Sequence, residues 1–297
     1  MINHTGKTFI SILLLALVLL SCGGDKKVNQ DAYGKNDTNG RFIELNGSQI
    51  YFETYGNKEH QALVLIHGNG GSIASMSHQI DYFKEEYFVI VADNRTHGRS
   101  GGADSLNYKM MAGDYMAVIN SLAIKSAHVL GHSDGGIIGL LMAINYPDKI
   151  SKLVAAVPNI VPGEAAIESW ELELSKQYRA LIDSMIRSGD QSRNWANEQL
   201  HMNLMRDYPN ITLSDLSKIK CPVLVMTSDN DIIKTRHILS IFENIPNAHL
   251  FVMPGATHFM IRDEHELYNS MSNRFLSTPF ARPTSKDVLM EMIGLNE

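Results

Sequence analysis

Short and almost uninterrupted apolar runs, separated by helix-length segments, constrain the fold of this 297-residue chain more than any other feature. Six such runs occupy residues 62–66, 88–92, 127–130, 153–157, 223–226 and 250–253. A strand with one exposed face alternates apolar and polar residues, so strands without alternation are typical of a sheet buried on both faces. Repetition of strand, helix and strand predicts an α/β fold, with a mostly parallel central sheet flanked by helices. Functional residues of such sheets lie at the carboxyl ends of the strands.

Two segments depart from this repetition. Residues 41–45 and 48–54 are typical of two strands joined by an Asn46-Gly47 hairpin turn. Between residues 158 and 216 there is no good strand, and apolar residues recur at helical spacing before Gly189. We interpret residues 159–216 as a helical cap insertion over the site, because loops at this sheet edge commonly carry function. Ordinary packing against the sheet is the alternative.

Composition narrows the class of protein. A hydrophobic content of 44% is enough for the buried core of one large domain. We place this domain at residues 41–276, and we assign no role to the C-terminal tail, 277–297. The net charge of -6 and the lack of a basic run make nucleic acid an unexpected partner. Two cysteines, Cys22 and Cys221, are too few for a disulfide framework.

The N-terminus has the pattern of a targeting segment. Lys7 carries the only formal side-chain charge in the first 21 residues, and residues 9–20 are apolar apart from one serine. The sequence Leu-Leu-Ser-Cys that ends at Cys22 resembles the lipobox of bacterial lipoproteins. We therefore expect residues 1–21 to be a signal peptide, Cys22 to carry a lipid anchor in the membrane, and the polar residues 22–40 to form a flexible tether. An uncleaved membrane helix is the alternative, and both interpretations place the domain outside the cytoplasm, here in the bacterial cell envelope.

The third apolar run leads into a motif that carries chemistry. Gly131-His132-Ser133-Asp134-Gly135 follows the run at 127–130 and precedes a helix-like segment, 136–145. A G-x-S-x-G sequence between a strand and a helix is the pattern of a nucleophilic serine on a sharp turn, where side chains at the glycine positions would collide with neighbouring backbone. A helix N-cap is the alternative role for Ser133.

An acid and a histidine follow in order. Asp229 and Asp231 come after the run at 223–226, and His258 comes after the run at 250–253, so serine, acid and histidine each stand at the end of a predicted strand. This chain resembles the α/β-hydrolase superfamily over most of residues 41–276. The resemblance includes the His-Gly-Asn-Gly-Gly loop at 67–71 and the Asp-Asn-Arg-Thr-His-Gly-Arg-Ser segment at 93–100.

The resemblance implies a role for each residue. Ser133 attacks an acyl carbon, His258 accepts its proton and later delivers it to the leaving group, and an aspartate fixes the tautomer of the histidine. We assign the acid to Asp231, because the family segment resembles the apolar pair that follows it; Asp229 is then a solvated turn residue. The backbone N–H groups of Asn69 and Asp134 would form the oxyanion hole.

These roles lead to an expected function. We expect serine-dependent hydrolysis of a small carboxylic ester or related acyl substrate through an acyl-enzyme, with no metal and no cofactor, since no H-E-x-x-H pair or dinucleotide fingerprint occurs. A serine nucleophile argues against the dehalogenases and epoxide hydrolases of the superfamily. A carbon–carbon bond hydrolase or an aminopeptidase of the same fold, and a non-catalytic envelope-anchored ligand-binding protein, are the alternatives.

The acid beside the nucleophile carries a further expectation. The elbow resembles that of valacyclovirase-like aminoacyl ester hydrolases, in which this acid faces the ammonium group of the substrate. Asp134 is therefore a candidate substrate-binding residue for esters whose acyl part carries a free amine. The alternative is that Asp134 only favours the start of the following helix, where a negative charge interacts well with the helix dipole.

Overall fold

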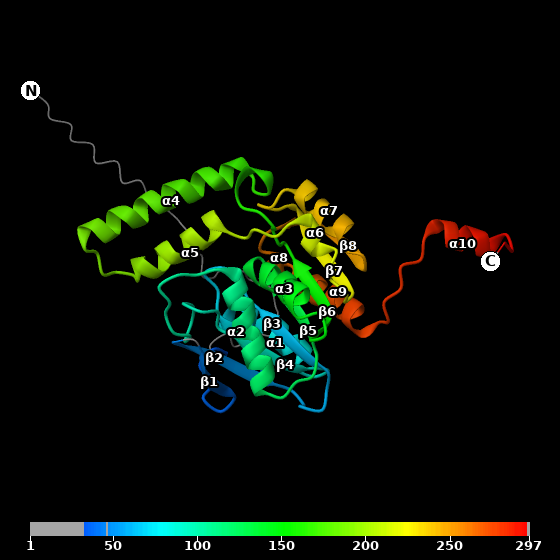
Figure 1. The fold of residues 1–297 in the computed structure, drawn as a ribbon, viewed down its shortest axis with the longest axis horizontal. Coiled ribbons are helices and arrows are strands. Elements are labelled where there is room, and N and C mark those ends of the chain that lie inside the picture. The colour runs from blue at the N-terminus through cyan, green and yellow to red at the C-terminus, as the bar shows by residue number, and fades with distance from the viewer. Residues whose placement is uncertain (1–32, 46, 296–297) are drawn as a thin grey trace, which may run out of the picture.

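The computed structural model describes residues 33–45 and 47–295, and these contain a single eight-stranded sheet (Figure 1). The strands lie in the order β1-β2-β4-β3-β5-β6-β7-β8. Their bounds are β1 Gly40–Leu45, β2 Ser48–Tyr55, β3 Ala62–Ile66, β4 Phe88–Ala92, β5 Ala127–His132, β6 Ile150–Ala156, β7 Val223–Asn230 and β8 Ala248–Thr257. The β1/β2 and β2/β4 pairs are antiparallel and all other pairs are parallel.

Helices cover both faces of this sheet. Their bounds are α1 Ser77–Phe83, α2 Tyr108–Ser121, α3 Asp134–Asn145, α4 Ser169–Ser188, α5 Trp195–Asp207, α6 Leu213–Leu216, α7 Thr235–Asn244, α8 Met260–Asp263, α9 His265–Ser277 and α10 Ser285–Met292, with short 3₁₀ turns at Ile73–Met76 and Gly163–Ala165. Helices α2, α3 and α7 contribute to the core on one face, and α1 and α9 to the core on the other. The fold class predicted from the sequence is confirmed.

The core explains why the strands lack polar residues. All five side chains of β3 are buried, and they alternate between the two faces of the sheet. Val64 and Ile66 pack with Ile138 of α3, whereas Leu63 and Leu65 pack with Ile80 of α1. A strand covered on both faces gains free energy from an apolar residue at every position, at about 25 cal/mol per Å² of apolar surface buried.

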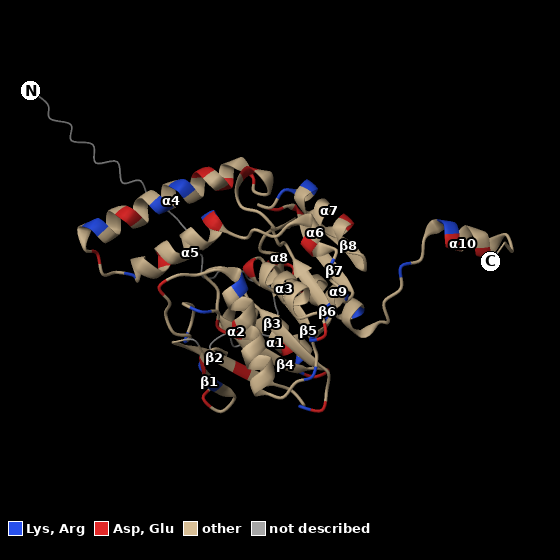
Figure 2. Ribbon diagram, in the orientation of Figure 1, with Lys and Arg blue, Asp and Glu red and all other residues tan. Residues whose placement is uncertain are grey.

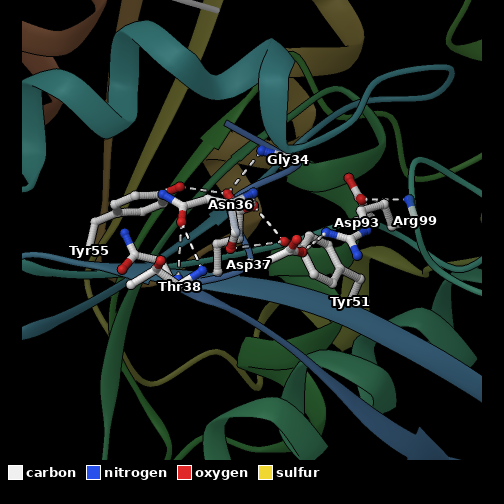
Figure 3. A network of polar contacts seen from close by, with 10 residues as sticks. Gly34, Asn36, Asp37, Thr38, Tyr51, Tyr55, Asp93 and Arg99 are labelled. Atoms are coloured by element: carbon white, nitrogen blue, oxygen red, sulfur yellow. Dashed lines mark hydrogen bonds and ion pairs between the residues drawn. The ribbon is translucent and has the colours of Figure 1, made fainter. Parts of the chain in front are cut away.

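The segment before β1 differs from the flexible tether that its composition suggests. Residues 33–39 lie against β2, where the buried carboxylate of Glu53 accepts hydrogen bonds from the backbone N–H groups of Gly34 (2.9 Å) and Asn36 (2.8 Å) (Figure 3). The hydroxyls of Tyr51 (2.7 Å) and Tyr55 (2.6 Å) donate to the same carboxylate. A buried charge requires such donors, so Glu53 orders a segment that has little of its own to bury.

In the chain between β6 and β7, helices α4 and α5 form a hairpin that projects from the sheet (Figure 1). A small apolar cluster joins the two helices, in which Ile182 of α4 packs with Trp195 and Met202 of α5. The outer helix, α4, carries charges of both signs along its length, whereas the elements of the sheet carry few (Figure 2). This hairpin lies within the insertion, 159–216, that the sequence predicts to be helical.

The proposed signal peptide and Cys22 lie outside the described residues. Within residues 33–45 and 47–295, no helix combines the length and the apolar character that crossing a membrane requires. The tail beyond α9 contains α10, which exposes Leu289 and Met292, and Ile293 directly after this helix is exposed as well.

Candidate active site

Ser133 lies on a strained turn between β5 and α3. Its φ of 55° is in the left-handed region, which serine rarely adopts, and the flanking glycines make the turn possible. A Cβ atom at Gly131 would lie 2.0 Å from the carbonyl oxygen of Gly135, and a Cβ atom at Gly135 would lie 2.1 Å from the carbonyl oxygen of Ile66. The turn therefore needs glycine at both positions, and it leaves the Ser133 side chain partly exposed at the end of the strand.

A continuous hydrogen-bonded chain starts at the serine hydroxyl. Ser133 Oγ lies 3.0 Å from His258 Nε2, and His258 Nδ1 lies 2.8 Å from Asp231 Oδ1. Two further donors hold the carboxylate, the backbone N–H of Ile233 at 2.8 Å from Oδ1 and the hydroxyl of Ser228 at 3.0 Å from Oδ2. Since Asp231 and His258 are buried, the histidine can accept the serine proton without competition from bulk water.

The structure distinguishes the two candidate acids. Asp231 follows β7 and faces His258. Asp229, in contrast, is exposed near the end of the strand, where its carboxylate accepts a hydrogen bond from the neighbouring Asn230 side chain (2.8 Å). Strands β5, β7 and β8 are parallel and end at the same edge of the sheet, so residues that follow them come together there.

The two predicted oxyanion donors belong to segments close to Ser133. The Ser133 amide donates to Ala156 O (2.9 Å), so the next amide, that of Asp134, is the first of helix α3 and belongs to a turn whose N–H groups have no intrahelical acceptor. Asn69 is in the loop after β3, and a Cβ atom at the adjacent Gly68 would lie 3.1 Å from Ser133 Cβ. The loop therefore passes close to Ser133.

The Asp134 side chain forms contacts that the sequence analysis missed. Its Oδ1 accepts from the Tyr108 hydroxyl (2.8 Å) and its Oδ2 from the side-chain amide of Asn69 (3.0 Å). Burial raises the pKa of the Asp134 carboxyl, and these two hydrogen bonds act in the opposite direction. Tyr108 begins α2 and looks in the sequence like one more aromatic core residue, so only its contact reveals its place beside the site.

The chain is similar to known hydrolases. Residues 61–186 match the family described as "alpha/beta hydrolase fold". Over 256 residues the chain is 27% identical to the protein of Caulobacter sp. (strain K31) named "Putative carbamate hydrolase RutD", covering 77% of this chain and 96% of that one. The fold and these matches identify the chain as a hydrolase of α/β-hydrolase fold. It is also 25% identical over 262 residues to "Serine hydrolase BPHL" of Homo sapiens, covering 82% of this chain and 88% of that one.

Solved structures share the fold of this hydrolase. A hydrolase from Pseudomonas aeruginosa PA01 superposes with a TM-score of 0.70 at 20% identity, and the match covers 82% of this chain and all of that one.

Two histidines near the triad have structural contacts. His67 Nε2 accepts from the backbone N–H of Asn94 (3.0 Å) and its Nδ1 donates to Gly68 O (2.8 Å), which connects the loops after β3 and β4. His132 Nε2 donates to His258 O at 2.8 Å and so supports the loop that carries His258. Burial lowers the pKa of both rings to about 3, so each is neutral at neutral pH.

Within residues 33–45 and 47–295, no three His, Cys, Asp or Glu side chains gather in a way that could hold a metal ion.

Proposed function

We propose that this hydrolase cleaves a small carboxylic ester or related acyl compound through an acyl-enzyme on Ser133. The observation that carries the proposal is the chain from Ser133 through His258 to Asp231, with distances of 3.0 and 2.8 Å, on a turn whose strain presents the serine hydroxyl. Similarity to proteins named as a carbamate hydrolase and a serine hydrolase supports an acyl substrate.

The geometry supports a sequence of steps. His258 Nε2 takes the proton of Ser133 as its Oγ bonds to the acyl carbon, and the new oxyanion accepts hydrogen bonds from the amides of Asn69 and Asp134. The imidazolium then gives its proton to the leaving alcohol as the carbon–oxygen bond breaks. A water molecule, deprotonated by the same nitrogen, then attacks the acyl carbon. The bond between that carbon and Ser133 Oγ breaks, the carboxylic acid leaves, and the imidazolium returns its proton to Oγ. Asp231 stabilises the imidazolium in both halves of the reaction.

The first test combines labelling and kinetics. A fluorophosphonate probe should label the wild type at Ser133, because the reaction needs an activated serine, whereas a protein that only binds ligands should not react. On a panel of acyl and aminoacyl esters, Ser133→Ala or His258→Ala should lower kcat by several orders of magnitude, since the triad acts as a unit. Retention of more than about a tenth of the wild-type rate by Ser133→Ala would remove the proposal. Carbon–carbon and peptide substrates should be assayed beside the esters, because they distinguish this proposal from the alternative reactions of the fold.

We further propose that the acyl part of the substrate carries an amine that binds Asp134. This carboxylate is buried beside the nucleophile and its two hydrogen-bonded partners, Tyr108 and Asn69, are neutral. Each carboxylate oxygen accepts more than one hydrogen bond, so an ammonium group can be added to these contacts. A charged hydrogen bond in such a place contributes about 1.5 to 3 kcal/mol, which is about 10- to 150-fold in kcat/KM.

The amine proposal has its own measurement. The ratio of kcat/KM for an α-aminoacyl ester to that for its des-amino analogue should be high in the wild type and fall towards one in Asp134→Asn. Tyr108→Phe is the matched control, because it removes one neutral donor and leaves the charge, so the ratio should stay high. A ratio near one in the wild type would assign Asp134 to the helix start alone.

We also propose that the protein is a lipoprotein of the bacterial cell envelope, anchored through Cys22. The support is the apolar run that ends in Leu19-Leu20-Ser21-Cys22. Firm anchoring needs more than one acyl chain, and a bacterial lipoprotein carries more than one.

A further inference from the structure

The loop that carries Asn69 rests on a histidine from the loop after β4. The backbone N–H of Gly70 donates to His97 Nε2 (3.1 Å), and His97 Nδ1 lies 3.0 Å from Arg95 O. Because a backbone N–H can only donate, His97 Nε2 accepts and Nδ1 carries the proton. The imidazole ring is thus held at both nitrogens, and it fixes the amide next to the predicted oxyanion donor.

Helix α5 of the cap contacts the loop after β4, at His97 and the neighbouring Thr96. The ring of His201 stacks on that of His97, with centroids 4.0 Å apart and an interplanar angle of 16°. The Thr96 hydroxyl donates to Arg95 O (2.6 Å), so His201 Nε2 donates to Thr96 Oγ1 (2.9 Å). Asn197 of α5 donates to Thr96 O (3.3 Å), which adds a third contact.

The surroundings keep both rings neutral. Only 4% of His97 and 9% of His201 are exposed. Burial, with His201 beside it, lowers the pKa of His97 to about 4, and burial also lowers the pKa of His201. The other titratable groups that act on His97 are His67 from the loop after β3, Asp134 of α3 and Glu198 of α5. At neutral pH His97 Nε2 is therefore free to accept from Gly70.

We propose that His97 is a positioning residue for the oxyanion loop and that His201 couples the placement of cap helix α5 to that loop. The inference rests on the proposed function, because it assigns the Asn69 amide to the oxyanion. If α5 moves away, His97 loses the ring that it packs against, and the Gly70 and Asn69 amides lose their fixed direction. Hydrolysis then depends on the position of the cap.

The first half of the test removes the acceptor. His97→Phe keeps a ring that can stack on His201 but cannot accept from Gly70, so kcat for p-nitrophenyl acetate should fall about 10- to 100-fold with KM almost unchanged. The inhibition constant of a trifluoromethyl ketone should rise by a similar factor, because the oxyanion of its adduct with Ser133 occupies the same hole. His97→Gln, which supplies a side-chain acceptor, should recover part of the loss and covers the case in which the Phe variant does not fold.

His237→Phe is the matched control. His237 is also buried, and its Nε2 accepts a backbone N–H, that of Ile160 (3.0 Å), so the variant loses the same kind of contact away from the oxyanion loop. Its kcat and its inhibition constant should stay within about threefold of the wild type, whatever its melting temperature. If His97→Phe and His97→Gln behave like this control, His97 does not position the loop.

The second half of the test concerns the cap. His201→Ala should lower kcat, and His201→Phe, which keeps the stacked ring, should restore most of it. In the His97→Phe background, His201→Ala should lower kcat by a smaller factor than it does in the wild type, because both changes act through one contact. If the kcat losses of the two single variants simply multiply in the double variant, or if His201→Ala changes KM alone, the proposed coupling is wrong. Full activity of Ser133→Ala, in contrast, would overturn the proposed function itself, and this outcome is distinct from a failure of the His97 and His201 variants to lower kcat.

Discussion

Substitution of Asp231 by Asn tests the proposed acid of the triad, and the expected result depends on how this side chain is oriented. Oδ1 accepts from both His258 Nδ1 and the Ile233 amide, each at 2.8 Å, and Oδ2 accepts from the Ser228 hydroxyl at 3.0 Å. An amide nitrogen in place of Oδ1 would face the backbone N–H of Ile233, donor against donor. The carbonyl oxygen should therefore take that place, and the amide nitrogen should face the Ser228 hydroxyl, which can rotate to accept.

This orientation sets the size of the effect. His258 keeps the tautomer in which Nε2 accepts from Ser133, and what is lost is the negative charge opposite the imidazolium. A hydrogen bond to a charged group contributes about 1.5 to 3 kcal/mol, so kcat of Asp231→Asn should fall about 10- to 150-fold. The measurement is kcat for p-nitrophenyl acetate, with thermal unfolding to show that the variant is folded.

Asp229→Asn is the control, since its side chain is exposed and has no contact with the triad, and its kcat should stay within about twofold. A loss near 10⁴ in Asp231→Asn, which is typical of a wrong histidine tautomer, would show that the amide takes the other orientation. A larger loss in Asp229→Asn would move the acid to that residue.

Two further predictions concern the elbow and the anchor. A Cβ atom at Gly135 would lie 2.1 Å from Ile66 O in the central strand β3, so Gly135→Ala should lower the free energy of unfolding in urea by about 1 to 3 kcal/mol or prevent folding. Gly102→Ala, where no atom lies within 4 Å of the added Cβ, should leave it unchanged; equal effects would contradict the close approach. Cys22→Ser should abolish fatty-acid labelling and shift the protein out of the membrane fraction, and labelling that persists would exclude lipid attachment at Cys22.

The strands could be predicted where both faces are covered and less well elsewhere. The apolar run at 62–66 coincides with β3, which is buried at every position. The run at 250–253 covers only part of β8, Ala248–Thr257, because this strand has a neighbour on one side only and carries exposed residues, Pro254 and Gly255 among them. Apolar content marks the buried part of a strand, whereas backbone pairing sets its length.

Residues at strand ends could be located from the sequence, but side-chain contacts between loops could not. Ser133, Asp231 and His258 each follow a strand, and parallel strands bring these positions to one edge. The contact of Asp134 with Tyr108 joins residues 26 apart, and that of His97 with His201 joins α5 to a loop more than a hundred residues earlier. Such contacts depend on rotamers and on the placement of the cap, which no local pattern encodes.

A buried charge was the signal that could have corrected the extent of the tether. Glu53 interrupts an otherwise apolar stretch of β2, and a carboxylate in a buried strand must find hydrogen-bond donors. Tyr51 and Tyr55, two residues away on the same face of the strand, supply two of them, and Gly34 and Asn36 supply the others. The need of Glu53 for these donors, rather than any apolar residue to bury, places residues 33–39 in the folded domain. The same logic applies to Asp134, whose buried charge has only neutral partners among the described residues, and it gives the amine proposal its physical basis.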